Sequence, residues 1–221
     1  IVVGPGSLEM LESLLPCDAK KVLIAHAPPL AAIADSLRGK LGQREVFLAE
    51  MPDAEGAKRI EVASFCWGIL GQTDFQRNDV IVSLGGGATT DVAGFVAATW
   101  LRGVPVIHIP TTVLGMVDAA IGGKTGINTA EGKNLVGSFY APTAVIVDPD
   151  VLASISENDV RTGLAEVVKC GFIKDTKILD LLEKHPEDAL DTTSTVFLEL
   201  VTRAVRVKAD VVGEDFLEAG G

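Results

Sequence analysis

Residues 80–91 read VIVSLGGGATTD, and this stretch decides the fold class. An apolar run with strand character meets three glycines, Gly85 to Gly87, and then turns to small polar residues and an aspartate. A helix expected from Ala88 to about Trp100 would direct its first N–H groups and its positive dipole end toward a phosphate. The spacing is not G-x-G-x-x-G, so the turn alone leaves open both a phosphate cradle and a purely structural bend.

Short β-branched runs alternate with amphipathic stretches over the first two-thirds of the chain. Five runs predict strands, at 21–26, 45–48, 79–84, 104–110 and 144–148. Between them, residues 29–41 and 57–71 carry apolar side chains at helical spacing. This alternation predicts a mostly parallel sheet covered by helices, and such sheets bind ligands beyond the carboxyl ends of their strands.

The pattern changes after residue 150, where only helices are predicted. Residues 160–173, 176–185 and 194–212 have helical spacing, and Ser156 with Asp159 forms a helix start of the capping-box type. The predicted fold class is therefore α/β, a Rossmann-like sheet domain over 1–150 followed by an all-helical domain that begins at 151. A domain of about 70 residues is short, so we expect residues 151–221 to be the start of a longer domain and the chain to be incomplete.

Composition excludes several function classes. The 221 residues carry a net charge of −11, which gives a nucleic-acid partner no electrostatic footprint. Neither a membrane span nor a secretory leader is indicated, because no apolar stretch reaches the ~20 residues a span needs and the first residues lack a basic region. The three cysteines, Cys17, Cys66 and Cys170, are too few for a disulfide framework, so we expect buried thiols and a cytoplasmic location.

Polar residues follow the ends of neighbouring predicted strands. Thr111 and Thr112 come directly after the strand that ends near Pro110, which places two hydroxyls close to the glycine turn. Residues 52–58 put Asp53, Glu55 and Lys58 on a loop before a helix, and a carboxylate there suits a ribose diol. Ordinary helix capping explains each residue singly but is less convincing for the set.

A long glycine-rich segment at 116–142 has no clear secondary-structure period. Long ordered loops of this type are usually functional. It holds five polar candidates: Asp118, Lys124, Asn128, Lys133 and Asn134. Two lysines in such a loop of an acidic chain indicate an anionic ligand, with a flexible solvated loop as the alternative.

Glu166 and Lys169 are three residues apart and share one face of a predicted helix. They could form a plain surface ion pair. Their neighbours are apolar, so we expect both side chains to be partly buried, and a buried carboxylate needs a partner or a metal.

Taken together, these segments resemble the 3-dehydroquinate synthase family. Five stretches match that family in order and spacing over about 85–171: SLGGGATTDVAGFVAATWLRG, IPTT, DAAIGGKTGIN, GKNLVGSFYAP and AEVVKCGFI. Iron-type alcohol and glycerol dehydrogenases share the architecture and a GGG-x-x-x-D turn, but GGKTGIN followed by GKN is not expected of them.

The resemblance implies a lyase of the shikimate pathway, which leads to chorismate and the aromatic amino acids. Its substrate is the anionic sugar phosphate 3-deoxy-D-arabino-heptulosonate 7-phosphate, its products are 3-dehydroquinate and phosphate, and NAD is reduced and reoxidised in each turnover. A divalent metal, zinc or else cobalt, is the second implied cofactor, and a homodimer is implied as the assembly.

The resemblance also assigns roles to residues of this chain. Twelve positions match cofactor contacts: Asp53, Glu55, Lys58, Gly86, Gly87, Asp91, Thr111, Thr112, Lys124, Lys133, Leu152 and Ser154. Six match substrate-binding or catalytic positions: Arg102, Asp118, Lys124, Asn134, Lys169 and Lys208. Arg102 matches an arginine that reaches the substrate phosphate across a subunit interface.

Glu166 matches the carboxylate ligand of the metal. The family's other two ligands are histidines, which we expect beyond Gly221, because His26, His108 and His185 match neither position.

Three alternatives stay open from the sequence. They are a related cyclase for another seven-carbon sugar phosphate, an NAD-dependent polyol dehydrogenase of the iron type, and an inactive, truncated NAD-binding module.

Overall fold

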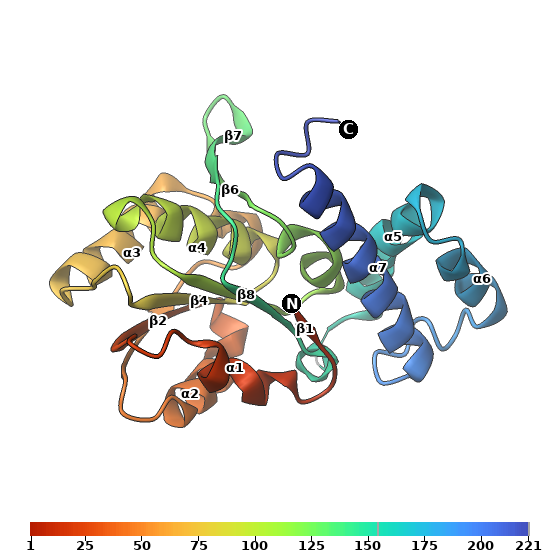
Figure 1. The fold of residues 1–221 in the computed structure, drawn as a ribbon, viewed down its shortest axis with the longest axis horizontal. Helices are drawn as coiled ribbons and strands as arrows, with labels where there is room; N and C mark the ends of the chain where they lie inside the picture. The colour runs from red at the N-terminus through yellow and green to blue at the C-terminus, as the bar shows by residue number, and fades with distance from the viewer. Residues whose placement is uncertain (154, 221) are drawn as a thin grey trace.

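The computed structural model describes residues 1–153 and 155–220, and its centre is a six-stranded parallel sheet (Figure 1). The strands are β1 (Val2–Val3), β2 (Lys21–His26), β3 (Glu45–Glu50), β4 (Val80–Gly85), β5 (Val106–Pro110) and β8 (Ala144–Val147). Their order is β1-β8-β5-β4-β2-β3 and every pairing is parallel. The predicted α/β class and its five strands are confirmed, and within the described part of this sheet the two-residue edge strand β1 is the one that was not predicted.

Helices cover both faces of this sheet. The helices α1 (Leu11–Leu14) and α2 (Ala31–Lys40) lie on one face, and α3 (Ile60–Gln72) and α4 (Gly87–Thr99) lie on the other (Figure 1). Short turns of helix join them: η1 (Ser7–Met10), η2 (Pro28–Leu30), η3 (Ala54–Ala57), η4 (Trp100–Arg102), the π-helical η5 (Gly115–Ala119) and η6 (Pro149–Leu152). Along β2, Val22 and Ile24 enter one core and Leu23 and Ala25 the other, because successive strand residues face opposite sides.

The segment predicted as an irregular loop is in part a β-hairpin. Strands β6 (Lys124–Thr129) and β7 (Gly132–Phe139) pair antiparallel and project from the body of the molecule (Figure 1). The loop prediction for 116–142 is therefore wrong over these residues. Strand β7 is exposed along nearly its whole length, so its sequence shows no apolar-polar alternation.

After β8 and the short turn η6, the described residues form three α-helices: α5 (Glu157–Ile173), α6 (Lys177–Lys184) and α7 (Thr195–Glu214). The predicted change to helices is confirmed, and within 1–153 and 155–220 no strand follows β8. Ser156 caps α5 by accepting the N–H of Asp159 at 3.2 Å, and its hydroxyl donates to the Asp159 carboxylate at 2.6 Å. The Asp159 side chain thus binds the cap hydroxyl.

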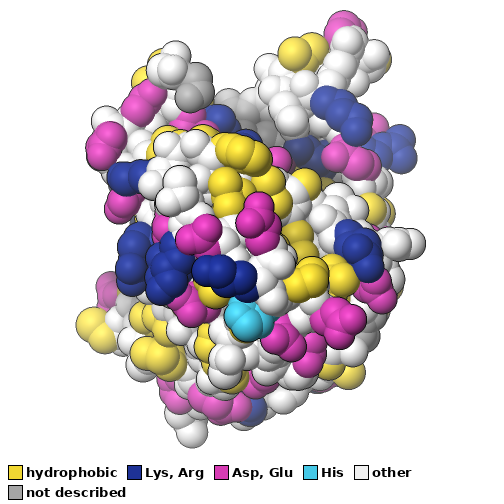
Figure 2. Space-filling model, turned by 90° about the vertical axis from the view of Figure 1, so that its right-hand side faces the viewer, with side chains coloured by type: hydrophobic (Ala, Val, Ile, Leu, Met, Phe, Trp, Pro, Cys, Tyr) yellow, Lys and Arg dark blue, Asp and Glu magenta, His cyan; other side chains and the backbone are white. Residues whose placement is uncertain are grey.

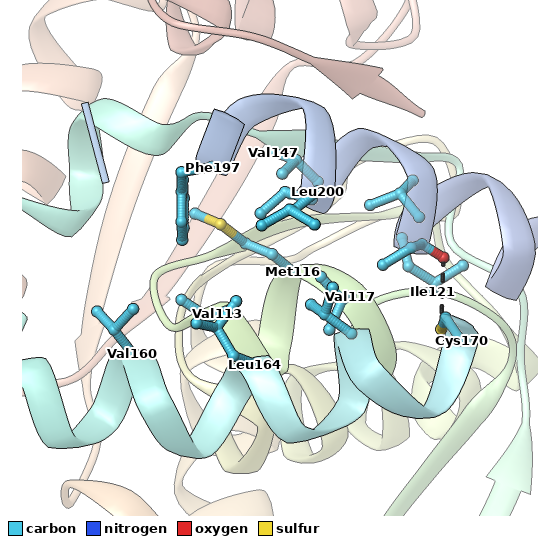
Figure 3. Close-up of a cluster of buried hydrophobic side chains, with 14 of the residues drawn as sticks. Val113, Met116, Val117, Ile121, Val147, Val160, Leu164, Cys170, Phe197 and Leu200 are labelled. Atoms are coloured by element: carbon cyan, nitrogen blue, oxygen red, sulfur yellow. Dashed lines mark hydrogen bonds between the residues drawn. The ribbon is translucent and has the colours of Figure 1, made fainter. Parts of the chain in front are cut away.

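A single apolar cluster joins the helices to the segment after β5 (Figure 3). Phe197 and Leu200 from α7 meet Met116, which lies between α5 and α7. Val147 of β8 belongs to the same cluster. The cluster therefore crosses residue 150, and the division of the chain into domains there stays a prediction.

Two further expectations concern thiols and membranes. Cys66 and Cys170 are buried, as expected, whereas Cys17 is exposed in the turn after α1, so that prediction is wrong. Among the described residues, no helix combines the length and the apolar character needed to cross a membrane.

Candidate active site

A polar cavity of about 630 Å³ opens beside the hairpin. The hairpin and the C-terminal end of α7 project from the same side of the molecule, and the space-filling view shows a hollow between two projections there (Figures 1 and 2). Among the lining residues are six that the sequence had singled out: Asp91, Asp118, Lys124, Asn134, Lys169 and Lys208. The fold thus collects residues from α4, η5, the hairpin, α5 and α7 around one space.

Two lysines of the cavity share a carboxylate that the sequence reading missed. Glu218 lies 2.8 Å from Lys208 Nζ and 2.9 Å from Lys124 Nζ. Lys208 also lies 2.9 Å from Asp118, which the π-helical turn η5 presents. Glu218 lies in DFLEAG after a helix and belongs to no motif. It reaches the lysines because the chain returns over Gly123 after α7.

These ion pairs keep the cavity charged at neutral pH. Burial, the largest single influence on Lys208, would lower its pKa, but hydrogen bonds to Glu218 and Asp118 outweigh it and the pKa is raised. For Glu218, burial alone would raise the pKa, and the two lysines together lower it. An anionic ligand that enters the cavity must therefore replace a carboxylate partner of a lysine or share that lysine with it.

Glu166 and Lys169 form an ion pair on α5. The hydrogen bond to Glu166 is the main cause that raises the pKa of Lys169. The Glu166 side chain is 29% exposed and that of Lys169 is 53% exposed, so the expectation of partial burial holds for Glu166 and is wrong for Lys169. Lys169 reaches past the end of its apolar surroundings because its stem is long.

The described residues do not by themselves make a metal site. Within 1–153 and 155–220, no three His, Cys, Asp or Glu side chains are grouped so that they could hold a metal ion. Zinc needs at least three protein ligands, and Glu166 would supply one of them.

The helix after the glycine turn begins without a side-chain cap. Gly86 is the N-cap residue of α4, and no side chain accepts its first N–H groups. Gly86 and Gly87 are partly accessible. The free N–H groups and the helix dipole make this point a fit for an anionic group such as a pyrophosphate.

The glycines also meet the predicted hydroxyl pair. Thr111 donates its N–H to the Gly85 carbonyl at 2.9 Å, and Thr112 Oγ1 accepts the N–H of Gly115 at 3.1 Å. A Cβ on Gly86 would lie 3.2 Å from the Thr112 methyl, and one on Gly87 would lie 3.0 Å from Ala119. Small residues here let the neighbouring strand ends approach.

A buried lysine lies behind the cavity. Lys58 is only 4% exposed, and its Nζ lies 2.5 Å from Asp91 and contacts the Asn134 amide oxygen. Burial is the main cause that raises the pKa of Asp91, and Lys58 opposes the rise. The side chain of Asn134 is thereby tied to α4.

Other predicted cofactor residues lie outside the cavity lining. Asp53 accepts the N–H of Ala54 at 2.8 Å at the start of η3, and Glu55 accepts from Asn128 at 2.8 Å and lies 3.8 Å from Lys133. Their loop is accordingly joined to the hairpin.

Three predicted positions do not join either group. Arg102 is exposed and does not line the cavity. Its φ of 64° is left-handed. The Leu152 side chain is buried in the apolar cluster. Ser154 lies outside the described residues.

Comparison with known proteins extends this description. Residues 48–162 match the family model described as 3-dehydroquinate synthase N-terminal, and residues 163–221 match the one described as 3-dehydroquinate synthase C-terminal. The 3-dehydroquinate synthase of Leifsonia xyli subsp. xyli is 58% identical over 221 residues, and that of Arthrobacter sp. (strain FB24) is 55% identical over 222. All of this chain is covered, and it spans 62% and 61% of the length of those relatives.

A solved structure shares the fold. The 2-epi-5-epi-valiolone synthase ValA of Streptomyces hygroscopicus subsp. jinggangensis 5008, determined with NAD+ and Zn²⁺ bound, aligns with a TM-score of 0.89 at 29% identity. The alignment covers 99% of this chain and 62% of that one.

The parallel sheet, the uncapped helix at its carboxyl edge and the attached helices place the protein among chains with the sugar phosphate cyclase fold. Within that class, the two family matches are decisive. The chain belongs to the 3-dehydroquinate synthase family.

Proposed function

We propose that the protein is a 3-dehydroquinate synthase, a lyase that converts 3-deoxy-D-arabino-heptulosonate 7-phosphate to 3-dehydroquinate and phosphate. The observation that carries this proposal is the cavity, which gathers Lys124, Lys169 and Lys208 with Asp118 and Asn134. These residues come from five separate elements of the chain. Close relatives that carry this name support the same assignment.

The side chains of the cavity suit a sugar phosphate. Lysine ammonium groups attract phosphate and carboxylate as compact charges. Asp118 can accept a hydrogen bond from a substrate hydroxyl, and the Asn134 amide can donate one. Each of the three lysines already has a carboxylate partner, so the anionic groups of the substrate would replace some of these carboxylates.

NAD is the cofactor we propose for the neighbouring strand ends. The first N–H groups of α4 would receive its pyrophosphate, Asp53 or Glu55 a ribose diol, and Thr111 and Thr112 would lie beside it. Bound NAD supplies a hydride acceptor that returns the hydride within the same turnover. Titration of the chain with NAD+ by calorimetry tests this site, and absence of binding would overturn it.

We propose a divalent metal, zinc in the first place, as the second cofactor, because the similar ValA structure was determined with Zn²⁺ bound. Glu166 is the ligand we assign to it. In the complete gene product, Glu166→Gln should weaken zinc binding at least about tenfold, because a neutral amide replaces an anionic ligand. Glu157→Gln, on the same helix and paired with Arg161 at 2.6 Å, is the control; unchanged zinc affinity in Glu166→Gln would refute the assignment.

A homodimer and a cytoplasmic location complete the proposal. Arg102 is exposed outside the cavity of its own chain, which is compatible with an action on the cavity of a partner. Sedimentation of the complete gene product would measure the oligomeric state.

The activity test measures phosphate release with NAD and a divalent metal present. Lys124→Ala in the complete gene product should lower kcat/KM by at least about 100-fold, because it removes a charge that faces the substrate. Lys177→Ala is a matched control, since Lys177 is 57% exposed and pairs with Glu199 at 3.4 Å, much as Lys124 is 58% exposed and pairs with Glu218. Near-normal phosphate release by Lys124→Ala would count against the proposal.

A related cyclase activity is the second candidate, favoured by the similarity to ValA. A panel of seven-carbon sugar phosphates would separate the two cyclases. Net accumulation of NADH would instead favour a polyol dehydrogenase, and NAD binding without any turnover would favour an inactive module.

A further inference from the structure

Lys58 makes three contacts that no other described residue combines. Its Nζ lies 2.5 Å from Asp91 on α4 and contacts the Asn134 side chain on β7. Its carbonyl oxygen accepts the N–H of Asn128 on β6 at 2.8 Å. Lys58 ends the loop that starts at Asp53 and is buried, so this one residue joins the loop to α4 and β7 through its side chain and to β6 through its backbone.

The hairpin depends on such an anchor. Strand β7 is exposed over nearly its whole length, and the β6–β7 ladder is irregular between Ile127 and Thr129. Packing on β7 therefore does little to fix its tip.

Asn134 has a conformation that its neighbours must hold. Its φ of 58° is left-handed, which costs a non-glycine residue free energy and persists only where contacts maintain it. Its N–H binds the Asn128 side chain at 3.0 Å. Among the described residues, Lys58 is the hydrogen-bond partner of the Asn134 side chain.

Asn134 and Asp91 both line the cavity, whereas Lys58 does not. We propose that Lys58 is a positioning residue that fixes the tip of the β6–β7 hairpin to α4 and so holds Asn134 in the cavity. The loop Asp53–Lys58 also reaches the hairpin through exposed contacts of Glu55, and the Lys58 ammonium group is the buried contact between them. The effect on turnover rests on the proposed function; the effect on the hairpin does not.

Backbone hydrogen exchange of the 221-residue chain tests the anchor without any ligand. In Lys58→Met/Asp91→Asn, which removes both charges of the buried pair, the amides of 128–134 should exchange at least about tenfold faster, while those of β4 stay protected. Asp91→Asn alone is the reference that keeps the lysine. Lys21→Met is the matched control, because Lys21 binds the Thr73 and Asp74 carbonyls in another part of the fold. Unchanged exchange at 128–134 would overturn the proposal.

Should the double variant fail to fold, Lys58→Arg supplies the same test. It keeps the positive charge beside Asp91 but replaces the compact ammonium by a longer planar fork that cannot repeat the two buried side-chain contacts with Asp91 and Asn134. Faster exchange at 128–134 in a folded Lys58→Arg chain supports the anchor, and exchange equal to that of the unaltered chain refutes it.

Kinetics of the complete gene product test the consequence for turnover. If Lys58 acts through Asn134, Lys58→Arg and Asn134→Ala should each lower kcat/KM, and the double variant should be no slower than the slower single one. Multiplied losses, with a raised Kd for NAD+ in Lys58→Arg, would show that Lys58 serves the cofactor alone and would refute the coupling. If the unaltered protein neither binds NAD+ nor releases phosphate, the proposed function fails, and hydrogen exchange alone decides the anchor.

Discussion

His108 is a buried base that the candidate site does not use. It lies on β5 opposite Ser83 of β4, and its Nδ1 is 2.7 Å from the Ser83 hydroxyl. Both side chains are buried, which lowers the pKa of His108 to about 4. His108 is therefore a hydrogen-bonded residue of the core.

We predict that this histidine makes the fold sensitive to mild acid. Its pKa in the folded chain lies below the ordinary value near 6.5, so between about pH 6.5 and pH 4 the unfolded chain binds more protons and stability falls as the pH falls. From about pH 7 to pH 5, His108 should account for a loss of roughly 2 kcal/mol. Urea unfolding of His108→Gln should lack this part of the slope.

His185→Gln is the control for the pH series, because His185 is exposed near Asp188. The two unfolding series together separate the buried histidine from the carboxylates that titrate in the same range. Equal slopes for the unaltered chain and His108→Gln would contradict the prediction.

The sequence predicted some of the residues that line the cavity and missed others. Lys124 and Asn134 were found because both lie in the glycine-rich segment and in stretches that match the family, and Lys208 because it matches a substrate-binding position of the family. Glu218 was missed because its contacts with Lys124 and Lys208 arise from the path of the chain after α7. Local pattern cannot report a contact of that kind.

Among the elements, the turn from β4 into α4 carries a glycine with no room for a side chain. A Cβ on Gly85 would lie 2.4 Å from the Thr89 hydroxyl and 2.6 Å from its Cβ. None of Gly85, Gly86 and Gly87 has a positive φ, so close approach, and not a special backbone conformation, requires glycine here.

We predict that Gly85→Ala destabilises the fold by about 2 kcal/mol, since the added methyl must displace a buried Thr89. It should also weaken NAD+ binding, because the start of α4 moves with Thr89. Gly68→Ala is the control: Gly68 lies in α3 with nothing within 4 Å of an added Cβ, and alanine there should stabilise by roughly 0.5–1 kcal/mol. Thermal unfolding measures both changes, and equal stability of the two variants would sink the argument.

Element prediction succeeded where burial leaves a pattern. The strands β2 and β4 are buried along most or all of their length, and their sequences are nearly continuous apolar runs. The hairpin gave no such signal, because β7 faces solvent over most of its length. The π-helical turn η5 was also missed, although it is the element that presents Asp118.

At the scale of the whole molecule, the helices and the sheet share one apolar cluster. Phe197 of α7 is fully buried within it, together with Met116 and Val147 of the sheet part (Figure 3). The face that Figure 2 shows carries charged side chains around apolar ones. Phe172 of α5 is 76% exposed. Composition and period predicted two parts of the chain, but not that their cores are continuous.

We therefore predict that the two parts unfold together. Phe197→Ala should lower the free energy of unfolding by about 3–5 kcal/mol and the Tm by roughly 10 °C.

Two spectroscopic signals follow the two parts of the chain. Both tryptophans, Trp67 and Trp100, pack against the sheet core between α3 and α4, so their fluorescence reports the sheet, while circular dichroism at 222 nm reports the helices. With a shared core, both signals should shift by the same amount. Phe172→Ala should change the free energy of unfolding seen by either signal by no more than about 0.5 kcal/mol. A fluorescence transition that stays in place while the helical signal moves would show that the parts are separate folding units, and would favour the division near residue 150.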